Sequence, residues 1–240
     1  MKNWLVRLKG EEFDLEILPP LFHSTQLSII KENGSYYLKS SDFDSLKLAD
    51  EVRESAIAII EILNSAMVLS NHNFHDISED GVLLVEKNGK RCFSLYLEES
   101  IGIRSRVSTK PKATTPDGIQ QIAPQHSNIE SWVNLAKNDK TVADALHFLK
   151  KGTWISLYKV YEIIKDDIGS DVIINSGFAK KTKLRRFTQT AQSRLALGDE
   201  ARHASKKCRP PAKPMTFIEA KSFIGGILIN WICLKKINIY

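Results

Sequence analysis

The first hundred residues alternate apolar and polar positions in short runs that end at glycine, proline or asparagine–glycine pairs. The run NWLVRLKG places Trp4, Val6 and Leu8 on one side of an extended chain and stops at Gly10, so it predicts a strand. The next run, FDLEILPP, ends at two prolines, and we interpret it as a partner strand.

Two asparagine–glycine pairs, Asn33-Gly34 and Asn88-Gly89, stand between apolar runs. A two-residue turn needs positive φ at both positions, so each pair predicts a tight hairpin. The run DEVRESAIAIIEILNSAM between the hairpins has helical spacing, with apolar residues Val52, Ala56, Ile59, Ile60, Leu63 and Met67. Residues 1–108 are therefore predicted to form a hairpin-rich α+β domain with a mostly antiparallel sheet and one or two helices.

The pattern changes in residues 109–127, which contain Pro111, Pro116 and Pro124 and few apolar residues, as is typical of a linker. From residue 128 to residue 240 the apolar spacing is helical, and an all-α bundle is predicted. The predicted helices are NIESWVNLAKNDKTVADALHFLKK with a break near Asn138-Asp139, TWISLYKVYEIIKDDIG, FAKKTKLRRFTQTAQ and MTFIEAKSFIGGILINWICLKK. In the last run, Thr216 and Glu219 have the spacing of a capping box.

Composition places the chain among ordinary globular proteins, with 42% hydrophobic and 26% charged residues in 240. No continuous apolar run reaches the length of a membrane span, and the first residues lack a secretory pattern, so we expect no membrane partner. Cys92, Cys208 and Cys233 are far apart and form no C-x-x-C pair, which favours a reducing cytoplasm and argues against a zinc site or another cofactor.

Charge is distributed unevenly along the chain. Residues 1–110 hold 13 Lys and Arg against 17 Asp and Glu, whereas the remainder holds 21 against 11. A basic half beside an acidic half favours a polyanionic partner, and we expect nucleic acid, with RNA favoured over DNA. The alternative is an ordinary solvated basic face.

The basic residues gather between Lys180 and Lys213, where only Asp199 and Glu200 are acidic. Phosphate contacts by such residues dominate affinity for nucleic acid. Phe178 and Phe187 are the nearby aromatic residues, which argues against a dedicated single-strand platform. The predicted nucleic-acid contacts are Lys180, Lys181, Lys183, Arg185, Arg186, Lys206, Lys207 and Arg209.

The same segment contains one histidine, His203, which can move a proton near neutral pH. If the protein is an enzyme, we expect His203 to act as acid and base, Arg202 and Arg194 to stabilise an anionic phosphorane, and Asp199 to orient the imidazole. That set would suffice for metal-independent RNA cleavage by the 2′-hydroxyl. The alternative is a structural histidine on a helix, with acids three and four residues before it.

Other candidates carry less weight. His72, His75 and Asp76 have the spacing of half a metal site. Glu162 and Asp166 lie one helical turn apart and could bind a divalent ion, but a solvated acidic face explains this pair better. Aromatic residues on one helical face, Trp154, Tyr158 and Tyr161, are compatible with a small-molecule cleft but more typical of a core. Phosphate-loop, nucleophile-elbow and H-E-x-x-H motifs are absent.

Three stretches, LYKVYEIIKDDIG, RRFTQTAQSRLALGDEARHA and KPMTFIEAKSFIGGILINW, resemble a family of bacterial proteins without an assigned activity. At one remove, the helical half is similar in outline to HEPN-type bundles of toxins and phage-defence proteins, many of which are ribonucleases with an Arg-x4-6-His motif. The spacing here differs, because eight residues separate Arg194 from His203 and Arg202 adjoins His203.

The resemblance implies nucleic-acid binding, either by a metal-independent ribonuclease or by an accessory subunit of a bacterial defence system. The alternative is a non-enzymatic scaffold subunit that binds a second protein or another copy of this chain. A competing polyanion separates these alternatives better than salt, because both modes of binding are electrostatic.

Overall fold

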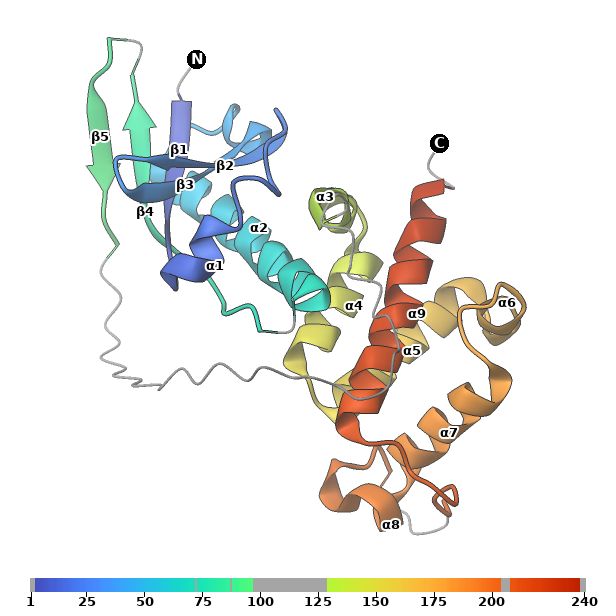
Figure 1. Cartoon of the computed structure of the whole chain (residues 1–240). Helices are drawn as coiled ribbons and strands as arrows, with labels where there is room; N and C mark the ends of the chain where they lie inside the picture. Colours follow the sequence, from blue (N-terminus) through green and yellow to red (C-terminus); the bar gives the residue numbers. More distant parts are fainter. Residues whose placement is uncertain (1–2, 72, 87, 97–128, 204–207, 238–240) are drawn as a thin grey trace.

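A computed structural model describes residues 3–71, 73–86, 88–96, 129–203 and 208–237 (Figure 1). The front part contains β1 Asn3–Lys9, α1 Glu12–Glu16, β2 Leu27–Glu32, β3 Ser35–Ser40, the 3₁₀ turn η1 Ser41–Phe43, α2 Ala49–Ser70, β4 Ser78–Val85 and β5 Arg91–Ser94. The back part contains α3 Ile129–Asn138, α4 Lys140–Lys151, α5 Trp154–Ile168, α6 Ser170–Asn175, α7 Lys181–Gln192, α8 Arg194–Leu197, the 3₁₀ turn η3 Gly198–Glu200 and α9 Phe217–Ile237.

The five strands form an antiparallel sheet in the order β2-β3-β1-β4-β5, so the α+β prediction is confirmed. Asn33 and Gly34 have φ of 49° and 77°, as a tight two-residue turn requires. In the second hairpin Gly89 has a positive φ of 83°. This hairpin closes through a hydrogen bond from the Glu86 amide to the Lys90 carbonyl at 2.9 Å, next to the paired residues Val85 and Arg91.

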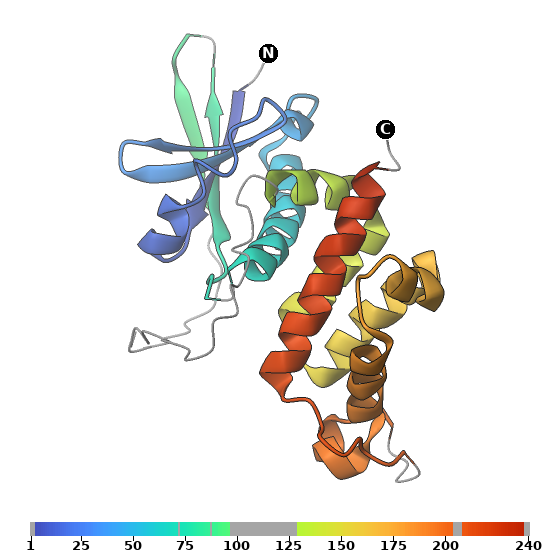
Figure 2. The same ribbon diagram turned by 45° about the vertical axis from the view of Figure 1, so that its right-hand side comes forward.

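The sheet is strongly bent. β1 pairs with β3 only from Val6 to Leu8, and the β2–β3 hairpin crosses the direction of β4 and β5 (Figures 1 and 2). As a result, Arg91 on edge strand β5 reaches Glu32 on the opposite edge strand, with 2.5 Å between guanidinium nitrogen and carboxylate oxygen. This ion pair ties the two edges of the sheet together.

The predicted strand FDLEILPP is wrong, because this segment begins with helix α1. An alternating strand would place Phe13 and Leu15 on the same face. Instead Phe13 is 72% exposed, while Leu15 and Leu18, three residues apart, are buried in the core. Contact of that pair with the core favours a helical turn over an extended chain.

Helix α2 packs on both parts of the protein. One side lies on β1 and β4, and the other contacts α3 and α4 (Figure 2). Ion pairs also cross this boundary, from Lys137 to Asp42 at 2.7 Å and from Lys150 to Asp76 at 2.6 Å. The two parts therefore share one hydrophobic core through α2. The predicted linker, residues 109–127, lies outside the described residues.

The predicted helices of the back part are confirmed, and the short helices α6 and α8 are additional. The predicted break falls at Asp139, whose carboxylate caps α4 by accepting from the Thr141 amide at 2.9 Å. The predicted capping box begins α9: the Thr216 amide donates to Glu219 at 2.9 Å, and the Glu219 amide donates to the Thr216 hydroxyl at 3.2 Å.

Helix α9 is the one helix of the described chain that is long and apolar enough to cross a membrane. An 18-residue stretch of it has a mean hydropathy of 1.5, and 44% of that stretch is buried. It contacts α5 and α4, and Ile224, Leu228 and Trp231 are inaccessible to solvent. The core helix of a soluble protein has the same length and composition.

Candidate nucleic-acid interface

Helix α7 has one apolar side and one basic side. Leu184, Phe187 and Ala191 are buried, and the Phe187 ring stacks on the rings of Trp154 and Tyr158 of α5 at centroid distances of 6.4 and 6.1 Å. Around the N-terminal half of α7 the charged side chains are exposed: Lys180, Lys181, Lys183 and Arg185. Core packing of the apolar side therefore fixes these cations toward solvent.

Residues 208–216 run back along α7. The Ser193 hydroxyl, just after α7, donates to the Cys208 carbonyl at 2.9 Å, and the Arg186 side chain donates to the Lys213 carbonyl at 2.6 Å. These two bonds hold Arg209 and Lys213, both exposed, along the flank of the helix. We call the six residues Lys180, Lys181, Lys183, Arg185, Arg209 and Lys213 the basic surface.

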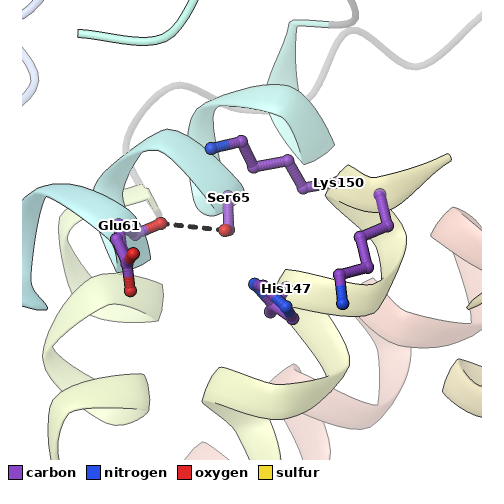
Figure 3. Close-up of a pocket in the computed structure, with 5 residues that line it drawn as sticks. Glu61, Ser65, His147 and Lys150 are labelled. Carbon is purple, nitrogen blue, oxygen red and sulfur yellow. Dashed lines mark hydrogen bonds between the residues drawn. The ribbon is translucent and has the colours of Figure 1, made fainter. Parts of the chain in front are cut away.

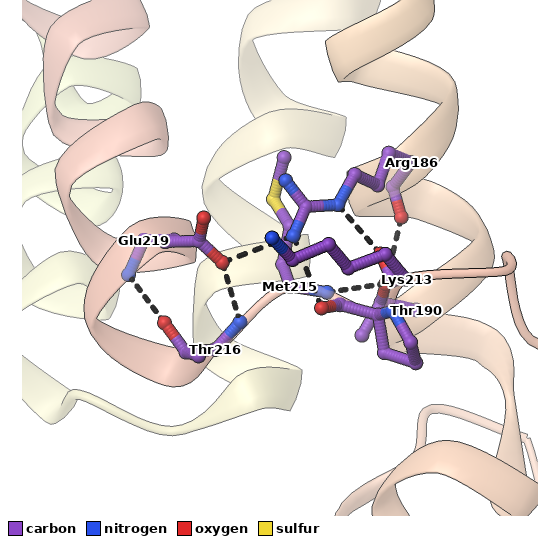
Figure 4. A network of polar contacts seen from close by, with 7 residues as sticks. Arg186, Thr190, Lys213, Met215, Thr216 and Glu219 are labelled. Atoms are coloured by element: carbon purple, nitrogen blue, oxygen red, sulfur yellow. Dashed lines mark hydrogen bonds and ion pairs between the residues drawn. The ribbon is translucent and has the colours of Figure 1, made fainter.

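Arg186 was predicted to contact nucleic acid, but its guanidinium is engaged within the protein (Figure 4). It donates to the carbonyls of Lys213 and Pro214, at 2.6 and 3.1 Å, and to the Glu219 carboxylate at 3.1 Å. The hydrogen bond from the Thr216 amide, together with the Arg186 charge, lowers the pKa of Glu219. Arg186 thus joins α7, the following loop and the first turn of α9.

Thr190, one turn after Arg186, completes this network (Figure 4). Its buried hydroxyl donates to the Arg186 carbonyl at 2.8 Å and accepts from the Met215 amide at 3.1 Å. The loop therefore attaches to α7 through main-chain atoms on both sides of Pro214.

The six residues of the basic surface make no ion pair with any described acidic residue. By contrast, Arg194 pairs with Asp199 at 3.0 Å. The predicted contacts Lys206 and Lys207 lie outside the described residues. The charge of the basic surface is thus not neutralised by the neighbouring side chains that the structure describes.

The predicted catalytic residues do not converge. Arg202 donates to Glu162 of α5 at 2.6 Å, and its guanidinium lies 4.4 Å from the centre of the Tyr158 ring. Asp199 contacts Arg194, and within the described chain no hydrogen bond joins it to His203. His203 is exposed and follows η3 in a non-helical stretch, so the alternative that placed it on a helix is wrong in that respect. The expected orienting role of Asp199 has no geometric support.

Described residues of the two candidate metal sites make contacts within the protein. His75 pairs with buried Asp14 of α1 at 2.8 Å, and Asp76 pairs with Lys150, while His72 lies outside the described residues. The described residues contain no cluster of three metal-ligating side chains. Glu162 is held by Arg202 rather than forming an ion site with Asp166. Sequence spacing offered no signal for Asp14, because it lies 61 positions before His75.

The aromatic stripe of α5 belongs to the core. Trp154, Tyr158 and Tyr161 are buried, and all three rings contact the ring of Phe187. The proposed small-molecule cleft is thus filled by the packing of α5 against α7.

A hollow of about 250 Å³ lies between α2 and α4 (Figure 3). Glu61 and Ser65 of α2 line one side, and His147, Lys150 and Lys151 of α4 line the other. The Ser65 hydroxyl donates to the Glu61 carbonyl at 2.8 Å, and Asp76 neutralises Lys150 at 2.6 Å. Because its charges are mixed, the hollow has no clear preference for a ligand of one sign.

Comparison with models of protein families, with curated proteins and with solved structures returned no match for this chain. The functional interpretation therefore rests on the geometry and charge of the basic surface.

Proposed function

We propose that this protein is a cytoplasmic nucleic-acid-binding protein whose basic surface contacts the phosphate backbone. The observation that supports this proposal is the set of six exposed cations on α7 and its adjoining loop, none paired with a described acid. Opposed charges within a protein weaken its attraction for a polyanion, whereas unpaired cations are free to replace condensed counterions.

The proposal gives a measurable salt dependence. If all six cations contact phosphates, the logarithm of the binding constant falls with the logarithm of salt concentration with a slope of roughly −5 for duplex and roughly −4 for single strands. Binding to a labelled oligonucleotide, followed by fluorescence anisotropy from about 50 to about 200 mM salt, measures this slope.

A charge-matched pair of variants locates the surface. Lys181→Gln with Arg185→Gln removes two cations from α7, and we expect the slope to become less steep by about two. Lys140→Gln with Lys165→Gln removes the same charge from exposed positions in the first turn of α4 and the last turn of α5. If the slope becomes less steep by the same amount in both double variants, the effect is one of overall charge, and the location of the binding surface on α7 is refuted.

Cleavage is tested with the same RNA. We propose His203 as the acid and base only for an active enzyme, because its imidazole is exposed and the amide of the preceding Arg202 donates to the Ala191 carbonyl at the C-terminal end of α7 at 2.9 Å. RNA cleavage without added metal that disappears in His203→Ala would support catalysis. Retained cleavage in that variant would exclude His203 from the reaction.

A further inference from the structure

We propose that the nucleic acid recognised by the basic surface is double-stranded. This inference rests on the proposed function and adds the class of substrate. It follows from where the aromatic side chains lie and from how firmly the cations are held.

Aromatic rings near the basic surface are not available for stacking. Phe187 is fully buried, and Trp154 and Tyr158 are more than nine-tenths buried. Phe223 of α9 is also buried, and the Lys183 ammonium lies 5.0 Å from the centre of its ring. Every Phe, Tyr and Trp that the structure describes in the back part is buried or half-buried.

The half-buried rings also have partners in the core. Phe217 packs edge-on against Trp154, with ring centres 5.9 Å apart, and Phe178 packs against the same core. Proteins that hold single strands stack successive bases on exposed aromatic side chains. This surface offers charge alone, so the bases of a single strand would add little affinity.

Charge alone favours a duplex, because two strands place more phosphates along each length of helix axis and bind a denser counterion layer. For six contacts, the slopes of log binding constant against log salt concentration differ by about 1.2 between duplex and single strand. Each tenfold dilution of salt therefore raises the ratio of the duplex to the single-strand binding constant by roughly fifteenfold.

The arrangement of the cations points the same way. Four are on or next to α7, and the loop carrying Arg209 and Lys213 is bonded to the helix at Cys208 and Lys213. A loop fixed in this way cannot easily follow a flexible strand. A duplex presents its phosphates in a regular array, so less conformational entropy is lost when the two surfaces meet.

The experiment compares a DNA duplex, an RNA duplex and a single strand of non-self-complementary sequence, all of the same length, in the anisotropy assay across the salt series. We expect both duplexes to bind roughly tenfold tighter than the single strand at about 0.1 M salt. Exclusive binding of the RNA duplex would also support the inference, with a 2′-hydroxyl contact added.

Two results would overturn the inference. A single strand that binds as tightly as the duplexes would refute duplex preference while leaving phosphate binding intact. Absence of binding to any of the three at low salt would refute the proposed function as well. As a further check, Thr182→Trp adds an aromatic ring beside Lys181 and Lys183 at an exposed position, and it should improve single-strand affinity more than duplex affinity.

Discussion

Replacing Arg186 by alanine should weaken both the fold and the binding of nucleic acid, although Arg186 itself is not expected to contact phosphate. The change removes hydrogen bonds to the carbonyls of Lys213 and Pro214 and to the carboxylate of Glu219. Side-chain exposures of 27% for Arg186 and 45% for Glu219 reduce the value of the ion pair. We expect a loss of about 2 kcal/mol in the free energy of unfolding.

Binding should also fall, although Arg186 itself is not expected to contact phosphate. Without Arg186 the Lys213 carbonyl loses its bond to α7 and the position of Lys213 along the helix is no longer fixed, whereas the Ser193–Cys208 bond still anchors the residue before Arg209. We therefore expect the salt slope to decrease in magnitude by about one. Arg186→Lys keeps the charge but lacks the planar fork of donors, so it should restore little of this loss.

Urea denaturation and anisotropy on the same preparations measure both effects, and Arg185→Ala is the matched control. Arg185 is exposed and makes no described ion pair, so its loss should change stability by less than about 0.5 kcal/mol and the slope by about one. If Arg186→Ala matches Arg185→Ala in both measurements, the network in Figure 4 does not hold the loop, and the reasoning fails.

Three further predictions concern the scaffold. Burial by itself would raise the pKa of Asp139, but the hydrogen bond and charge of Lys235 lower this pKa overall. The ionised carboxylate therefore contributes stability above about pH 4, and this stability is lost as pH falls through the lowered pKa. Lys235→Gln should cost about 1 kcal/mol at neutral pH, and urea titrations at several pH values should show this difference shrinking in acid. Gly81→Ala should destabilise the sheet by about 2 kcal/mol or more, because φ is +121° and the added Cβ would lie 2.6 Å from Phe93; unchanged thermal unfolding would contradict this. Phe187→Ala should cost about 3 to 5 kcal/mol by leaving a cavity among the rings of α5, α7 and α9, and a loss below 1 kcal/mol in chemical unfolding would show that the site collapses.

Local features of this protein were readable from the sequence because their causes lie within a few residues. Asn33-Gly34 tolerates positive φ, Asp139 caps the amides that follow it, and Thr216 with Glu219 closes the first turn of α9. Apolar spacing identified the long helices for the same reason, since a face repeated over three or more turns has one periodic interpretation. The segment of α1 is too short for that, and burial of Leu15 with Leu18 decided its conformation.

At the candidate site, too, some properties were determined by the sequence and others by the tertiary structure. Sequence alone determined that cations gather between Lys180 and Lys213, because charge is a property of the residues themselves. Which of them face solvent without a partner was decided by the tertiary structure. Glu162 is 40 positions from Arg202, and Glu219 is 33 positions from Arg186, yet both pairs meet when α5, α7 and α9 pack together. Ion pairs across such separations depend on packing geometry, which no local pattern of residues contains.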